Sequence, residues 1–190
     1  MIFGTTLPPI QQPCEIVEII VIGDSLSSDP LAYYPIDDAE ACISVRKGWA
    51  THPGWNTEHS IDPAFAPAEC GGLSPVECEF AIGGDIAFMQ IGTNNSDESI
   101  LSGAYESHIR QIVELSNVYG ITVVLVRPPI NYFRQGVLSE MHAALDRVGH
   151  DYGLLVIGPW FGWEQLQDDA VHVTPDGYQI FNEQILEVVQ

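Results

Sequence analysis

Positive charge is scarce in this sequence. Lys47 and five arginines stand against 26 acidic residues, which gives a formal net charge of -20 at pH 7. A nucleic-acid-binding protein needs basic side chains to neutralise phosphates, and no basic stripe is available here. We therefore expect no nucleic acid partner, and we expect the field of the protein to disfavour anionic substrates.

Long apolar runs are also missing. None approaches the length of a membrane span, so the sequence predicts no transmembrane segment. Residues 1–12 lack both the basic and the apolar region of a signal peptide. Either the protein is cytoplasmic or its leader is absent from this chain. With 190 residues and 46% apolar content, we expect a single domain over residues 1–190, with 1–13 as an N-terminal extension.

Metal-ligand spacing is absent among the four cysteines, since no C-x-x-C occurs. Cys70 and Cys78 flank a short Gly-Gly-Leu-Ser-Pro turn, and Cys14 and Cys42 each lie near an expected strand. We therefore predict disulfides Cys70–Cys78 and Cys14–Cys42, out of three possible pairings. Four reduced, buried thiols are the alternative. Disulfides favour a secreted or periplasmic protein, while a cytoplasmic location stays open.

A calcium loop is not predicted either. Asp29, Asp37 and Asp38 lie close together in the sequence but lack the ordered oxygen-ligand spacing of such a loop. We expect neither a metal ion nor a cofactor.

Apolar runs alternate with helical patterns along the chain, which is typical of a parallel sheet covered on both faces. Strands are expected at 15–22, 84–91, 121–126 and 154–157, with a short one near 42–45. Helices are expected over 98–119, over 133–150 and after Thr174-Pro175, and 49–73 is read as an irregular excursion. The fold class is therefore α/β, a three-layer α/β/α sandwich around a parallel sheet of about five strands.

Polar motifs follow three of these strands. Gly23-Asp24-Ser25-Leu26 closes the first strand, Gly92-Thr93-Asn94-Asn95 follows the strand at 84–91, and Asp169 and His172 follow the last. Ligands bind beyond the carboxyl ends of such strands, so the motifs should meet at one edge of the sheet. A serine, a histidine and an aspartate there can form a nucleophilic hydrolase site.

Each residue taken alone has a plainer interpretation. Ser25 is then a helix cap, Asn94 a turn former and His172 a surface histidine. Asp168 is an alternative partner to Asp169 for the histidine. The three motifs together favour the catalytic interpretation.

In this order the motifs resemble the SGNH (GDSL-type) hydrolase superfamily, over the chain from about residue 15 to its end. The segment His172-Val-Thr-Pro-Asp-Gly-Tyr178 is similar to the closing motif of that family. The resemblance implies a flavodoxin-like SGNH hydrolase fold. It also implies that Ser25 is the nucleophile, His172 the general base and then acid, and Asp169 the residue that orients His172.

The resemblance further implies an oxyanion hole made of the Ser25 N–H, a glycine N–H and the Asn94 amide. The glycine should follow the second strand, which points to Gly48, with Gly54 and Gly71 as alternatives that can equally be turn glycines. Where the third motif of the family usually ends in Asp, this chain has Asn95. We expect altered local hydrogen bonding there, with the Asn94 donor kept.

Four aromatic residues in expected loops are candidates for substrate binding, namely Tyr33, Tyr34, Trp49 and Trp55. They would form a wall for an acyl chain or a sugar ring, with core packing as the alternative. The other histidines are read as surface or core residues: His52, His59, His108, His142 and His150.

The sequence thus predicts a serine esterase that cleaves carboxylic esters of short to medium acyl chains through an acyl-enzyme, acting on a small-molecule or glycan ester. A carbohydrate O-acetylesterase or acyltransferase with the same residues is one alternative. A catalytically silent binding module is the other.

Overall fold

A parallel sheet of five strands forms the centre of the fold. The computed structural model describes residues 14–33, 36, 42–129, 135–158, 166–167 and 171–189. The strands are β1 (Val17–Gly23), β2 (Ile43–Arg46), β3 (Ile86–Gln90), β4 (Thr122–Val126) and β5 (Leu155–Ile157). Their order in the sheet is β2-β1-β3-β4-β5, with every neighbouring pair parallel. The five expected strands and the α/β class are confirmed.

Both faces of this sheet are buried, as the continuous apolar runs require. Side chains alternate along a strand, so Ile20 and Ile22 of β1 enter the core on one face while Ile19 and Val21 enter the core on the other. All four are fully buried. Helices must therefore cover both sides.

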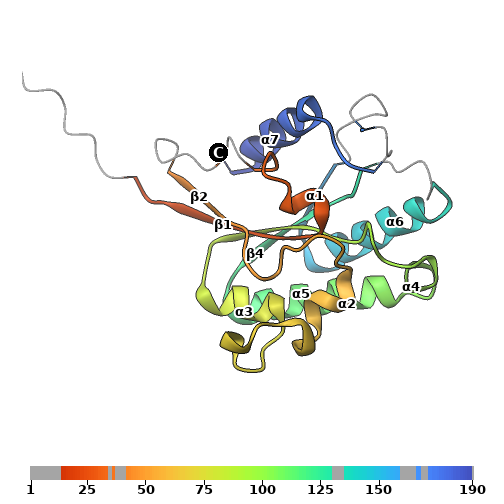
Figure 1. The fold of residues 1–190 in the computed structure, drawn as a ribbon, viewed down its shortest axis with the longest axis horizontal. Helices are drawn as coiled ribbons and strands as arrows, with labels where there is room; N and C mark the ends of the chain where they lie inside the picture. The colour runs from red at the N-terminus through yellow and green to blue at the C-terminus, as the bar shows by residue number, and fades with distance from the viewer. Residues whose placement is uncertain are drawn as a thin grey trace, which may run out of the picture.

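Helices cover both faces of the sheet (Figure 1). One face packs against α2 (Thr57–Ile61), α3 (Pro75–Ile82), α4 (Asp97–Leu101), α5 (Ala104–Tyr119) and α6 (Gln135–Tyr152). The other packs against α1 (Ser25–Ser28) and α7 (Pro175–Val189). The result is the expected three-layer sandwich.

Helix boundaries depart from expectation in three places. The pattern over 98–119 is divided between α4 and α5 at Gly103, whose φ of +82° interrupts the helix. The excursion 49–73 contains α2 and two short 3₁₀ turns, Pro63–Phe65 and Ala68–Cys70. Helix α3 was not expected. In contrast, α7 begins where predicted, with the Thr174 hydroxyl accepting the Gly177 N–H at 3.2 Å.

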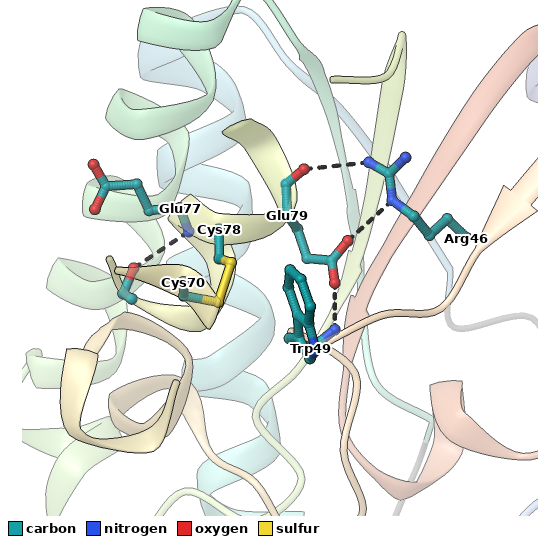
Figure 2. The surroundings of a disulfide bond; sticks show 7 residues. Arg46, Trp49, Cys70, Glu77, Cys78 and Glu79 are labelled. Atoms are coloured by element: carbon teal, nitrogen blue, oxygen red, sulfur yellow. Dashed lines mark hydrogen bonds and ion pairs between the residues drawn. A yellow bond between two sulfur atoms is a disulfide. The ribbon is translucent and has the colours of Figure 1, made fainter. Parts of the chain in front are cut away.

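Both predicted disulfides are present. Cys14–Cys42 joins the segments that lead into β1 and β2, with 6.0 Å between the Cα atoms. Cys70–Cys78 ties the second 3₁₀ turn to α3 across 5.5 Å (Figure 2). Such bonds form and persist in oxidising compartments. Within the described ranges, no helix is long and apolar enough to cross a membrane.

Candidate active site

The turn that carries Ser25 is packed tightly against the end of β3. A Cβ atom on Gly23 would collide with the Ser27 side chain and lie 2.8 Å from the Gln90 carbonyl oxygen, so only glycine fits. The Ser27 hydroxyl donates to the Gln90 side-chain oxygen at 3.1 Å. These contacts fix the position at which β1 ends and α1 begins with Ser25.

Asp24 joins this turn to the loop after β3. Its carboxylate is fully buried and accepts the main-chain N–H groups of Leu26 and Thr93, each at 3.1 Å. Burial raises the pKa of Asp24 to about 6, and the hydrogen bonds from Leu26 and Thr93 oppose that rise. Asp24 therefore ties the Ser25 turn directly to the loop that contains Asn94.

His172 lies beside Ser25, as the order of the motifs predicted. Its Nε2 atom is 3.2 Å from the Ser25 hydroxyl oxygen, and both residues are partly buried. The main chain of His172 is held by Gln167, whose N–H donates to the His172 carbonyl at 2.8 Å. An imidazole in this position can take a proton from the hydroxyl. Asp169 and its alternative, Asp168, lie outside the described residues.

Asn94 is exposed and reaches toward the segment that follows β2. Its side-chain N–H donates to the Trp55 carbonyl at 3.0 Å. A carboxamide nitrogen has two protons, so one remains for another acceptor. The amide thus lies where the loops after β2 and β3 meet.

The Asn95 side chain uses both its oxygen and its nitrogen in hydrogen bonds. The side chain is buried, accepts the Thr57 N–H at 3.2 Å, and donates to the Thr57 and Ser99 hydroxyls at 2.8 and 3.2 Å. A carboxylate in this position could only accept, so both hydroxyls would have to turn and donate to it. Asn95 therefore fixes the first turn of α2 beside the Asn94 loop.

Gly48 has a packing role. A Cβ atom there would collide with the Glu79 carboxylate. Figure 2 shows Glu79 between Arg46 and the main chain of Trp49, accepting from Arg46 Nε at 3.0 Å and from the Trp49 N–H. Because Glu79 needs this space, packing alone accounts for a glycine at position 48.

Gly54 directly precedes the residue whose carbonyl binds Asn94. Its φ of +80° is one that glycine adopts readily, and the next residue, Trp55, carries the carbonyl that binds Asn94. Gly71 caps the 3₁₀ turn Ala68–Cys70. Among the three glycines considered as an oxyanion donor, the contact between Asn94 and the Trp55 carbonyl favours Gly54.

The aromatic candidates occupy different environments. Tyr33 is only 1% exposed and packs edge-on against Phe181 with ring centroids 5.0 Å apart, so the prediction that it lines the site is wrong and the core alternative holds. Trp49 is 40% exposed, and its main-chain N–H donates to the Glu79 carboxylate. Trp55 is partly buried, and Tyr34 lies outside the described residues.

His52 is a residue that sequence reasoning missed. Its main-chain N–H donates to the Gly23 carbonyl at 3.1 Å, which puts it next to the Ser25 turn. Its ring stacks on Trp55 with centroids 5.0 Å apart and 24° between planes. The Pro53-Gly54 pair between them is a turn signal that could have indicated this pairing.

An apolar groove runs along α7. It has a volume of about 380 Å³ and is lined by Leu31, Pro175, Tyr178, Gln179, Asn182, Glu183 and Leu186. Neither Ser25 nor His172 is among these lining residues. In the part of the chain that the structure describes, no group of three or more His, Cys, Asp or Glu residues is arranged to hold a metal ion.

Comparison with solved structures identifies the fold. The psychrotrophic esterase EstA from Pseudoalteromonas sp. matches with a TM-score of 0.65 at 12% identity, over 90% of this chain and 96% of the other. A lipolytic protein of the G-D-S-L family from Veillonella parvula matches with a TM-score of 0.64 at 19% identity, over 90% and 97%. LAE5, an alpha/beta hydrolase enzyme from the metagenome of Lake Arreo, Spain, matches with 0.68 at 15%, over 91% and 94%.

No protein-family model and no curated protein matches the sequence. A protein described as an SGNH hydrolase, from Slackia heliotrinireducens, matches with a TM-score of 0.68 at 16% identity, over 93% of this chain and 100% of the other. The structural matches confirm the fold that the resemblance implied: this chain has the fold of the SGNH hydrolases.

Proposed function

We propose that this protein is a serine hydrolase that cleaves carboxylic esters, with Ser25 as nucleophile and His172 as general base. The observation that carries the proposal is the distance of 3.2 Å between the Ser25 hydroxyl oxygen and His172 Nε2. Two residues far apart in sequence meet within hydrogen-bond reach at the carboxyl edge of a parallel sheet, where such folds bind ligands.

The reaction follows from this pair. Ser25 attacks the ester carbonyl while His172 takes the hydroxyl proton, and a tetrahedral intermediate forms. His172 then gives the proton to the leaving alcohol, which leaves an acyl-enzyme on Ser25. Water repeats the sequence and releases the acid. The negative field of the protein favours departure of that anionic product.

Charge that develops on the carbonyl oxygen needs preorganised donors. We assign the Ser25 N–H and the second Asn94 side-chain proton to this role. For the glycine donor, the contact between Asn94 and the Trp55 carbonyl supports Gly54 over Gly48. Asp24 keeps the loops that carry Ser25 and Asn94 together through its bond to the Thr93 N–H.

The third triad member is Asp169 in this proposal. A carboxylate three residues before His172 can hold the imidazole in the tautomer that leaves Nε2 free to accept a proton. Asp168 is the alternative. Replacing each in turn by Asn distinguishes them, because only the true partner lowers ester turnover by orders of magnitude.

Location is part of the proposal. Two disulfides support a secreted or periplasmic protein, where such bonds persist.

Hydrolysis of an acetylated carbohydrate is a second candidate for the reaction, and the stacked rings of His52 and Trp55 favour it.

Labelling with a fluorophosphonate probe tests the proposed function. We expect the wild-type protein to be labelled on Ser25, as peptide mass spectrometry will show, and Ser25→Ala to be unlabelled. Ser28→Ala is a matched control at the other end of α1 and should still be labelled. Undiminished labelling of Ser25→Ala, or a wild-type protein that neither reacts nor turns over any ester, would contradict the proposal.

A further inference from the structure

We propose that His108 is a positioning residue, which fixes the loop of Asn94 through a chain of hydrogen-bonded side chains. The chain runs from α5 through Thr57, at the start of α2, to Asn95 in the loop after β3. This inference rests on the proposed function, because it names the device that holds the oxyanion donor of the same site.

The inner link of the chain joins Asn95 to Thr57. The Asn95 side-chain oxygen accepts the Thr57 main-chain N–H at 3.2 Å, a bond that only the oxygen of the amide can make. This bond fixes the orientation of the amide, so its nitrogen faces the Thr57 hydroxyl and donates to it at 2.8 Å. Thr57 is fully buried and Asn95 is 2% exposed, so water does not readily replace these bonds.

The outer link, to His108, follows from the count of protons. The Thr57 hydroxyl oxygen lies 3.0 Å from His108 Nδ1. A hydroxyl has one proton, and since its oxygen already accepts from Asn95, that proton can be donated to the imidazole. His108 is then neutral, with Nδ1 as acceptor and the ring proton on Nε2. The opposite tautomer would take this acceptor away from a buried hydroxyl proton, which costs free energy.

The surroundings of His108 favour the neutral ring. The side chain is partly buried, and burial lowers the pKa of His108 below its ordinary value, while the carboxylate of Glu58 on α2 acts in the opposite direction. Glu106 and Arg110 on the same helix pair with each other and with residues of α6, such as Asp151. The acceptor that the chain of bonds requires is therefore the form present near neutral pH.

The chain of bonds reaches Asn94 because two neighbouring asparagines bind one segment. Asn94 donates to the Trp55 carbonyl at 3.0 Å. Asn95 binds the main chain and the hydroxyl of Thr57, two residues further on. A displacement of Thr57 would therefore move the acceptor to which the Asn94 amide is bonded.

Helix α5 is a firm anchor for this segment. It packs against α2 (Figure 1), and Ile109, next to His108, is fully buried in the core. On its other side the loop is bonded to the Ser25 turn, through the Thr93 N–H and the Asp24 carboxylate. The loop that carries the proposed oxyanion donor is thus held from two directions.

Steady-state kinetics with p-nitrophenyl acetate tests the inference. His108→Leu removes the acceptor, so kcat should fall about tenfold while KM stays within about twofold, because an oxyanion donor acts mainly on the transition state. His108→Asn puts an oxygen acceptor where Nδ1 lies and should restore most of kcat. His150→Leu changes an exposed histidine of α6 and is the matched control, with kcat expected at the wild-type value.

A double-mutant cycle assigns the effect to the chain of bonds. Thr57→Val removes the hydroxyl and keeps the branched side chain, so kcat should fall by a similar factor, measured where circular dichroism shows each variant folded. Combined with His108→Leu it should fall no further, since both changes break the same chain. Wild-type kcat in His108→Leu, losses that multiply, or a loss that His108→Asn fails to restore would each overturn the inference.

Nuclear magnetic resonance separates this inference from the proposed function. In isotope-labelled Ser25→Ala near neutral pH, the His108 ring should carry its proton on Nε2. Adding His108→Leu should shift the side-chain amide signals of both Asn94 and Asn95. A proton on Nδ1, or an Asn94 signal that stays in place, would overturn the inference. These signals do not depend on turnover, so a wild-type protein that cleaves no ester would contradict the proposed function and leave this test decisive.

Discussion

The carboxylate of Asp24 accepts the main-chain N–H of Thr93 at 3.1 Å, across 69 positions of sequence. This bond joins the end of β1, where Ser25 begins α1, to the loop after β3, where Asn94 lies. It is made by a fully buried side chain whose other oxygen binds the Leu26 N–H. This carboxylate therefore helps to set the spacing of the proposed nucleophile and the proposed oxyanion donor.

Asp24 should make stability depend on pH in a defined direction. Its pKa is about 6 in the folded protein against 3.8 for the free group, so the folded state binds the extra proton between these values. The resulting stabilisation is complete below the unfolded pKa, is lost as pH rises through 6, and amounts to about 3 kcal/mol.

The side chain in Asp24→Asn does not titrate, so the variant lacks this pH-dependent stabilisation. Urea unfolding at about pH 4 and about pH 8 should show the free energy of unfolding of the variant gaining about 2–3 kcal/mol relative to wild type between the two values. The comparison between pH values matters because Asn also replaces one carboxyl oxygen with an amide nitrogen, a change in hydrogen bonding that is separate from the titration. Equal pH dependence in the two proteins would mean that Asp24 is not protonated near pH 6.

The Asn94 side chain should act on turnover rather than on stability. Asn94→Ala removes an exposed amide, so we expect ester kcat to fall by about two to three orders of magnitude while thermal stability changes little. Steady-state kinetics and thermal unfolding of the same preparation check this. Full turnover in Asn94→Ala would remove the residue from the oxyanion hole.

Gly48 and Gly54 should respond differently to alanine. Gly48→Ala forces a methyl group into the Glu79 carboxylate, so its main effect should be on the free energy of unfolding, by about 1–3 kcal/mol. At Gly54 nothing crowds the added Cβ, but the φ of +80° disfavours alanine and should shift the N–H that we assign to the oxyanion. For the same loss in free energy of unfolding, Gly54→Ala should therefore lower kcat more than Gly48→Ala does. A larger loss of kcat in Gly48→Ala would instead assign the donor role to Gly48.

Asn95→Asp should destabilise this protein. The carboxylate could only accept from the Thr57 and Ser99 hydroxyls, which would have to turn, and it would place a charge in a buried position. We expect a loss of about 2–3 kcal/mol in urea unfolding near neutral pH. Asn95→Ala, which buries no charge, is the control and should cost less. A variant with Asp that is as stable as wild type would show that the donor role is dispensable.

Replacement by alanine should destabilise the protein more at Tyr33, which lies in the core, than at Trp49, which lies at the surface. Tyr33→Ala removes a buried ring packed on Phe88 and Phe181 and should cost about 3–5 kcal/mol. Trp49→Ala, with a side chain that is 40% exposed, should cost much less. Denaturant unfolding of both variants checks the assignment of Tyr33 to the core, which a mild Tyr33→Ala would contradict.

The sheet and the meeting of the polar motifs could be predicted from the sequence because local pattern determines them. A buried parallel strand reads as an apolar run, and parallel strands place their carboxyl ends at one edge. The contact between Ser25 and His172 follows from that rule and from the order of the motifs. The two disulfides followed from the positions of the cysteines relative to the strands.

The segment after β2 could not be predicted in the same way. Its conformation depends on partners distant in sequence. Glu79 packs against Gly48, the Asn94 side chain donates to the Trp55 carbonyl, and the Gly23 carbonyl accepts the His52 N–H. None of these leaves a periodic pattern. Tyr33 was misassigned for a similar reason, since its loop turns inward to pack on Phe88 and Phe181.

The most direct test of the central claim is a double-mutant cycle on Ser25 and His172. We would measure ester turnover for wild type, Ser25→Ala, His172→Ala and the double variant. Because the two residues act as a unit, each single change should lower kcat by at least about a thousandfold, and the double variant should fall no further. Independent, multiplicative losses, or a single variant that keeps most of the turnover, would contradict the account.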